Sequence, residues 1–136
     1  MRLEGKVAIV TGGARGMGAV ESKLFAREGA KVVIADVLEE EGRQVEAEIA
    51  KAGGEAVFVR LDVTNENEWG DAVEQAVARF GKLNVLVNNA GISGRSYPDG
   101  TSSEGWERIM AVNSRGVFLG TRSVVPKMQE AGGGSI

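Results

Sequence analysis

The chain of 136 residues contains no cysteine and no histidine. The absence of cysteine excludes disulfide bonds and thiolate metal ligands, and we expect no metal site. Without histidine, the chain also lacks the side chain that most often transfers protons near neutral pH. No apolar stretch approaches the ~20 residues that a membrane span needs, and no signal-peptide pattern opens the chain. These absences fit a cytoplasmic protein with no membrane partner.

The charge balance and the composition indicate a single globular domain. A net charge of −3 without a dense basic run argues against a nucleic-acid partner. The hydrophobic fraction of 43% is ordinary for a folded α/β chain of this length. Glycine, with 20 residues, stands out at about twice its usual share of ~7%. Some glycines end helices, as at Gly29 and Gly53, and others gather in one short segment near the N-terminus.

That segment, Thr11 to Gly18, joins a predicted strand to a predicted helix. It follows the apolar run 7–10 and precedes an amphipathic pattern with Val20, Leu24 and Phe25 on one face. The N-terminus of a helix offers unpaired N–H groups and a partial positive charge to an anion. Glycines let the backbone turn sharply and come close to a pyrophosphate. We therefore predict a phosphate site, the alternative being an ordinary glycine-containing turn.

Asp36 follows the second apolar run, 31–35, and lies 18 residues beyond Gly18. A carboxylate at this distance can accept hydrogen bonds from an adenosine ribose and would repel a 2′-phosphate, which favours NAD over NADP. Arg15 argues weakly the other way, since a guanidinium in the turn could pair with that phosphate. No basic residue follows Asp36 directly, and we side with the carboxylate. The alternative is that Asp36 caps the next helix.

A fourth apolar run, 83–87, ends in Asn88-Asn89-Ala90-Gly91, and here the chain resembles the classical short-chain dehydrogenases/reductases. The likeness extends from about Leu3 to Ile136. The segment Thr11 to Gly18 matches the family's TGxxxGxG turn, and Asn88 to Gly91 matches its NNAG motif. Two further positions agree with the family: Asp62-Val63 matches the acidic pair that contacts adenine, and Asn113 stands where the family keeps an active-site asparagine.

The resemblance implies a fold, a cofactor and a set of site residues. The expected fold is a Rossmann-like, doubly wound parallel α/β sheet of strand order 3-2-1-4, with a truncated fifth strand. Residues 1–136 would form an NAD(P)-binding domain that is incomplete at its C-terminus. The implied catalytic residue is Asn113, and the cofactor is NAD, with NADP less favoured. The residues expected to bind the cofactor are Gly12, Arg15, Gly16, Met17, Gly18, Asp36, Asp62, Val63, Asn89, Ala90 and Gly91.

Two of these assignments have alternatives, and one neighbouring residue has an expected role of its own. Asp62 could instead cap the predicted helix that follows it. Asn113 could mark a simple irregularity in a helix, where asparagine is a poor former. In the NNAG motif we expect Asn88 to brace the fourth strand with its amide rather than to touch a ligand.

The apolar periodicity predicts alternating strands and helices. Strands are expected at 6–11, 31–35, 55–60 and 83–88, and helices at 17–28, 38–52, 66–80 and 103–130. The i, i+3, i+4 spacing of the third helix assigns Trp69 to packing. Residues 92–101 are predicted to form a loop whose Tyr97 or Arg95 either touches substrate or faces solvent.

The family's catalytic serine and its Tyr-x-x-x-Lys pattern have no counterpart in these residues. The chain's one tyrosine, Tyr97, is followed four residues later by Thr101, and Ser135 lies too early to be the serine. We therefore expect the cofactor-binding half of an NAD-dependent oxidoreductase that acts on a secondary alcohol or ketone, inactive by itself. The intact enzyme would be a homodimer or homotetramer. The alternative is a non-catalytic nucleotide-binding or interaction module of the same fold.

Overall fold

A computed structural model describes residues 1–93 and 101–136. Four parallel strands form one sheet in the order β3-β2-β1-β4. The strands are β1 (Val7–Thr11), β2 (Lys31–Asp36), β3 (Glu55–Arg60) and β4 (Val85–Val87). Between them run α1 (Gly16–Arg27), α2 (Glu39–Lys51) and α3 (Glu66–Phe80), and after β4 come α4 (Ser103–Met110), η2 (Ala111–Arg115) and α5 (Gly116–Glu130). The predicted α/β class and the strand order 3-2-1-4 are confirmed.

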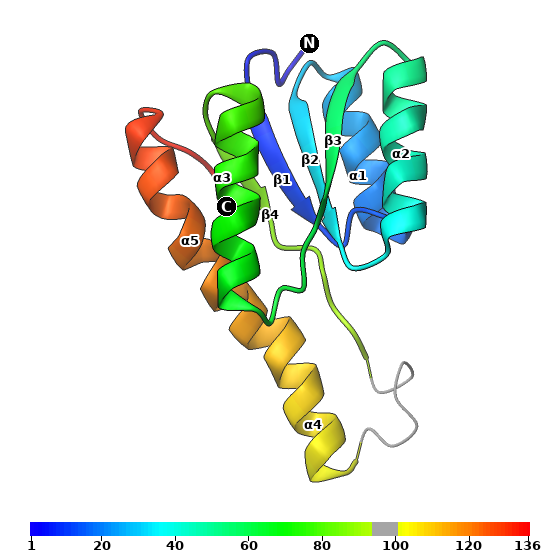
Figure 1. The fold of residues 1–136 in the computed structure, drawn as a ribbon, viewed down its shortest axis with the longest axis vertical. Helices are drawn as coiled ribbons and strands as arrows, with labels where there is room; N and C mark the ends of the chain where they lie inside the picture. The colour runs from blue at the N-terminus through cyan, green and yellow to red at the C-terminus, as the bar shows by residue number, and fades with distance from the viewer. Residues whose placement is uncertain (94–100) are drawn as a thin grey trace.

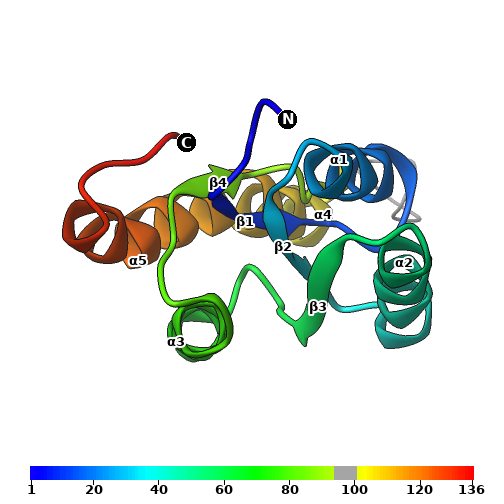
Figure 2. The same cartoon turned by 90° about the horizontal axis from the view of Figure 1, so that it is seen from above.

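The helices cover both faces of the sheet. Figures 1 and 2 show α1 and α2 on one face and α3 and α5 on the other. Side chains of a strand alternate between the two faces, and the core divides accordingly. Ile9 and Val33 pack in the cluster that contains Trp69 of α3, whereas Val10 and Ile34 pack in the cluster that contains Ile49 of α2. Every residue of β1 is buried, as expected for a central parallel strand.

The predicted apolar face of the first helix is wrong for two of its three residues, because only Phe25 packs against the core. Helix α1 turns its small residues to the sheet, with Ala19, Ser22 and Ala26 buried. Val20 and Leu24 are exposed at 65% and 40%. Small side chains let the helix lie close to the strands, so here size rather than apolarity decides which face is buried.

Two predicted elements differ in the structure. Strand β4 is shorter than the predicted strand 83–88, and the predicted helix 103–130 is interrupted by the π-helical segment η2. Beyond α5 the main chain returns to β4: the Ser135 N–H donates to the Asn84 carbonyl at 2.9 Å, and the Leu86 N–H donates to the Ser135 carbonyl at 3.0 Å. Ser135 therefore occupies the flank of β4 on which a fifth parallel strand is expected.

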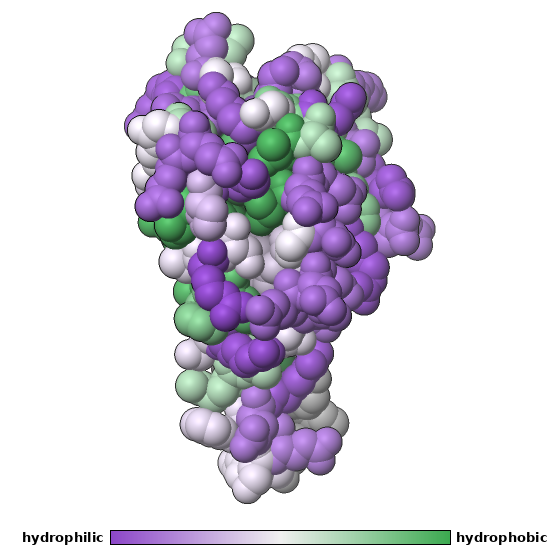
Figure 3. All heavy atoms as spheres, turned by 60° about the vertical axis from the view of Figure 1, so that its left-hand side comes forward, coloured by the Kyte–Doolittle hydropathy of each residue, from purple (hydrophilic) through white to green (hydrophobic). Residues whose placement is uncertain are grey.

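The helical segment from α4 to α5, residues 103–130, is called here the α4–α5 arm, and it carries exposed hydrophobic side chains. Figure 3, which brings the left-hand side of Figure 1 forward, shows hydrophobic surface among hydrophilic side chains. Large hydrophobic residues that are exposed on this arm are Trp106, Met110, Val117, Phe118 and Val125. Within the described residues, none of the helices has both the length and the apolar character that crossing a membrane requires.

Candidate functional site

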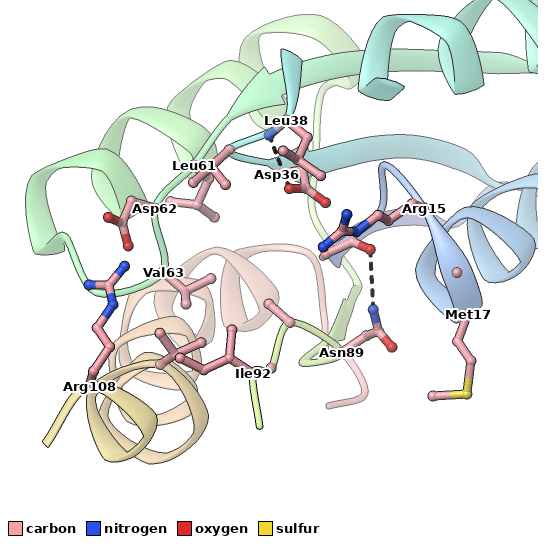
Figure 4. A pocket seen from close by; sticks show the side chains of 16 residues that line it. Arg15, Met17, Asp36, Leu38, Leu61, Asp62, Val63, Asn89, Ile92 and Arg108 are labelled. Atoms are coloured by element: carbon pink, nitrogen blue, oxygen red, sulfur yellow. Dashed lines mark hydrogen bonds between the residues drawn. The ribbon is translucent and has the colours of Figure 1, made fainter. Parts of the chain in front are cut away.

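A cavity of about 420 Å³ opens at the carboxyl ends of the strands, the edge at which open α/β sheets bind ligands (Figure 4). Its size is within the usual range for small-molecule sites. Segments that follow four strands contribute to it, together with the α4–η2 region. The lining residues are Gly12, Arg15, Gly16, Met17, Asp36, Val37, Leu38, Leu61, Asp62, Val63, Asn89, Ala90, Gly91, Ile92, Arg108 and Val112.

The glycine turn forms one end of the cavity. Gly12 and Gly16 adopt positive φ values of 64° and 56°, a region that other L-residues seldom enter. Arg15 is the N-cap residue of α1, and its side chain makes no capping hydrogen bond. The first N–H groups of α1 and the partial positive charge of the helix therefore remain available to an anion in the cavity.

Gly18 supports this turn from beneath, and it is not among the lining residues. A Cβ atom at Gly18 would collide with the Gly12 carbonyl oxygen and would lie 2.6 Å from Asn89 Nδ2. Gly18 is thus required for the close packing of α1 against the turn, whereas Gly16 has open space around it.

Thr11 and Asn89 join the glycine turn to the end of β4. Thr11 Oγ1 donates to the Val87 carbonyl at 3.1 Å and accepts from the N–H groups of Asn89 and Ala90 at 3.1 and 3.0 Å. Asn89 Nδ2 donates to the carbonyl oxygens of Thr11 and Gly12 at 3.0 and 3.3 Å. The prediction that Asn88 braces β4 is therefore wrong, because the bracing amide belongs to Asn89.

Asp36 links the end of β2 to the glycine turn. Its Oδ2 accepts from the Ala14 N–H at 3.0 Å, and its Oδ1 accepts from the Leu38 N–H at 3.1 Å. The residue is only 9% exposed, yet it lines the cavity. Helix α2 has Leu38 as its N-cap residue, with no capping side chain, so the alternative that Asp36 caps α2 is wrong. Each carboxylate oxygen keeps a second acceptor site for a ligand.

Asp62 and Val63 form the opposite wall. Burial alone would raise the pKa of Asp62, but hydrogen bonds from the Thr64 hydroxyl and N–H, with the nearby charges of Arg108 and Arg60, outweigh burial and lower that pKa. Figure 4 shows the Arg108 guanidinium pointing toward the Asp62 carboxylate. The cap of α3 is Asn65, whose Oδ1 accepts from two N–H groups of the first turn, so the capping alternative for Asp62 is wrong.

Asn113 lies in the π-helical segment and is tied to the chain after β4. Its Oδ1 accepts from the Ile92 N–H at 2.8 Å, and its Nδ2 donates to the Ile92 carbonyl at 2.7 Å. The helix is therefore irregular at Asn113, and the amide also fixes Ile92, a residue of the cavity wall. Asn113 itself does not line the cavity.

A family model for the short chain dehydrogenases matches residues 6–136. The chain belongs to this family. It is 50% identical over 135 residues to a 2,5-dichloro-2,5-cyclohexadiene-1,4-diol dehydrogenase of Sphingobium indicum, covering 99% of this chain and 54% of that protein. It is 54% identical over 135 residues to a 3-alpha-(or 20-beta)-hydroxysteroid dehydrogenase of Mycobacterium tuberculosis, covering 99% and 51%.

A solved hydroxysteroid dehydrogenase from Escherichia coli has the same fold. The TM-score is 0.91 at 36% identity, over 98% of this chain and 56% of that one. The chain spans about half the length of the curated relatives it matches. The predicted family and the Rossmann-like fold of a short-chain dehydrogenase are thus confirmed.

The structure brings most of the predicted site residues of this short-chain dehydrogenase into one cavity. Gly18 and Asn113 stand behind its wall, and Arg95 and Tyr97 lie outside the described residues. Sequence reasoning missed Arg108 and Val112, which come from the α4–η2 region and follow no recognisable motif. It also missed Val37, Leu38 and Leu61, which directly follow β2 and β3 and were detectable from their position at strand ends. In the described part of the chain, no group of three or more potential ligands could hold a metal ion.

Proposed function

We propose that this chain is the cofactor-binding half of an NAD-dependent dehydrogenase that transfers hydride between the cofactor and a secondary alcohol or ketone. The observation that carries the proposal is the cavity itself, with an uncapped helix N-terminus at one end and two carboxylates along its length. A dinucleotide has the matching chemistry, namely a pyrophosphate, a ribose diol and an adenine amine.

Asp36 supports NAD as the cofactor. The remaining acceptor sites of its carboxylate suit the two ribose hydroxyls, and its negative charge opposes a 2′-phosphate. Arg15 also lines the cavity, is exposed, and could pair with such a phosphate. We favour Asp36 because its carboxylate is fixed by two main-chain hydrogen bonds, whereas the Arg15 side chain is exposed.

The other residues have separable roles toward the cofactor. Gly12, Gly16 and Met17 would surround the pyrophosphate, and Gly18 would hold the turn in place. Asp62 and the Val63 N–H would bind the adenine, while Asn89, Ala90 and Gly91 would border the nicotinamide ribose. When bound, the nicotinamide ring supplies the hydride acceptor or donor. Asn113 would act from behind the wall by fixing Ile92.

Proton transfer to or from the alcohol oxygen needs a group within hydrogen-bond reach. The 136 residues offer no histidine or cysteine and no Tyr-x-x-x-Lys. We therefore assign the acid–base residues to a part of the parent enzyme beyond this chain, and propose that the chain alone is inactive. The chain's coverage of about half of each relative supports this assignment.

The relatives' names suggest the substrate class. The cyclohexadiene-diol and the 3-alpha-hydroxysteroid carry their hydroxyl groups on carbon rings, whereas the 20-beta-hydroxysteroid carries its hydroxyl group on the side chain attached to the ring system. We propose a secondary alcohol on a ring as the substrate, and a cytoplasmic location for the enzyme. We also propose that the enzyme is a homodimer or homotetramer, formed through the exposed hydrophobic residues of the α4–α5 arm.

The test is an oxidation assay with the longer protein that carries this chain. Cyclopentanol, cyclohexanol and open-chain 2-butanol are offered with NAD or with NADP, and the appearance of reduced cofactor is followed. The proposal predicts turnover with NAD and a preference for the ring alcohols. Turnover with NADP alone, or none with any alcohol, would contradict it.

A further inference from the structure

Helix α3 holds the Asp62–Val63 wall from behind by two consecutive side chains. Glu68 Oε2 accepts from the Asp62 N–H at 2.6 Å, and Trp69 Nε1 donates to the Val63 carbonyl at 3.0 Å. Adjacent residues of the helix thus bind the main chain of adjacent residues of the wall. Neither Glu68 nor Trp69 lines the cavity.

Glu68 occupies a position at which a helix usually caps itself. It is the third residue of α3, and in a capping box this residue reaches back to the N–H of the N-cap residue. Here the N–H of the N-cap residue, Asn65, already donates to the Asp62 carbonyl at 2.9 Å. Glu68 instead reaches past the cap to the cavity wall. Arg60 holds the Glu68 carboxylate in place with contacts of 2.8 Å to both oxygens.

Trp69 is fully buried, and its ring is enclosed by other parts of the core. A Cβ atom at Gly120 of α5 would lie 2.6 Å from the Trp69 ring, so a glycine there lets α5 pack directly against the indole. A Cβ atom at Gly116 would lie 2.8 Å from the Val63 side chain. The indole therefore lies directly against α5, and its N–H is directed at the Val63 carbonyl.

We propose that Glu68 and Trp69 are positioning residues for adenine recognition. By holding the main chain of Asp62 and Val63, they fix where the Asp62 carboxylate and the Val63 N–H lie in the cavity. This inference rests on the proposed function. An unpaired Val63 carbonyl or Asp62 N–H would turn toward water or another partner, and the two recognition groups would move with the main chain. The role differs from general packing, because it acts on the adenine end of a ligand and on no other end.

The test compares reduced NAD with its deamino analogue, in which hypoxanthine replaces adenine, so that a carbonyl oxygen stands in place of the exocyclic amine and the adjacent ring nitrogen carries a hydrogen. Binding of each to the protein is measured by calorimetry. The wild-type protein should prefer reduced NAD by about tenfold, the usual effect of one hydrogen bond to a charged group. In Trp69→Phe, which keeps a ring but loses the N–H, this preference should fall to about threefold or less.

Glu68→Ala provides a second variant at a site only partly buried, in case Trp69→Phe fails to fold. It should lower the same preference, whereas Glu68→Gln, which keeps an acceptor oxygen, should restore much of it. Glu74→Ala is the matched control: Glu74 is exposed on the same helix as Glu68, does not line the cavity and should leave the preference unchanged.

The outcomes separate this inference from the proposed function. If the wild-type protein binds neither ligand, the proposed function fails. If it binds reduced NAD with the expected preference and Trp69→Phe and Glu68→Ala keep that preference, the positioning role is refuted. Equal weakening of both ligands in the variants also refutes it, because that result indicates general loss of structure.

Discussion

Replacing Asp36 by alanine should weaken both the fold and the cofactor site, because one carboxylate serves both. The substitution leaves the Ala14 and Leu38 N–H groups without their acceptor. Ala14 is only 4% exposed, so its N–H cannot readily turn to water, and an unsatisfied buried group costs about 1–3 kcal/mol. The Leu38 N–H is better exposed to solvent and adds less. We expect the free energy of unfolding to fall by about 2–3 kcal/mol.

The same substitution removes the acceptor proposed for the ribose hydroxyls. The free energy of NADH binding should weaken by about 1–3 kcal/mol, which raises its Kd roughly 5- to 150-fold. The difference in affinity between NADH and NADPH should become smaller, because the negative charge that opposes the 2′-phosphate is gone. Urea denaturation gives the first quantity, and titration with each reduced cofactor gives the second. Glu40→Ala, in the exposed first turn of α2, is the control. Unchanged stability together with unchanged affinity for both cofactors would refute the reasoning.

Two further predictions concern the glycine turn and the acidic wall. Gly18→Ala should destabilise the fold strongly, because its Cβ would collide with the Gly12 carbonyl oxygen. Gly16→Ala should lower the free energy of unfolding by only about 1 kcal/mol through backbone strain, while weakening cofactor binding. Equal effects of the two variants on the free energy of unfolding would contradict this prediction. Thr64→Val should raise the pKa of Asp62 toward its ordinary value, as followed by carboxyl NMR, because the hydroxyl donor is lost. A lowered pKa stabilises the fold above pH ~4 and loses that effect as the pH falls through the folded value, so the stability gap between wild type and variant should shrink in acid. An unshifted pKa in the variant would be inconsistent with this account.

The sheet and most of the cavity could be predicted because both follow from strand ends. Apolar runs mark the strands, parallel strands end at one edge, and residues just beyond them must gather there. Asp36 was found in this way, whereas Asp62 and Asn89 were identified through the resemblance to the short-chain dehydrogenases. Arg108 and Val112 could not be predicted from strand ends, because they belong to α4 and η2, which come later in the chain than the four strands. Their contribution depends on how the α4–η2 region packs beside the cavity.

The errors also have physical causes. Alternation along β4 places Asn88 on the side of Leu86, toward α5 and close to Gly120, while Asn89 shares the side of Val87, toward α1 and the glycine turn. Counting this alternation would have chosen the right asparagine. The face of α1 was missed because hydrophobic periodicity ranks Val20 above Ala19, whereas close packing on the sheet requires the smaller residue.

The measurement that tests the central claim most directly is a fluorescence titration of the 136-residue chain with NADH and, in parallel, with NADPH. The account predicts saturable binding that is tighter for NADH, because the fixed Asp36 carboxylate accepts from the ribose and opposes the 2′-phosphate. Tighter binding of NADPH would contradict the role of Asp36. Failure of a cooperatively folded chain to bind either cofactor would contradict the claim that these residues form the site.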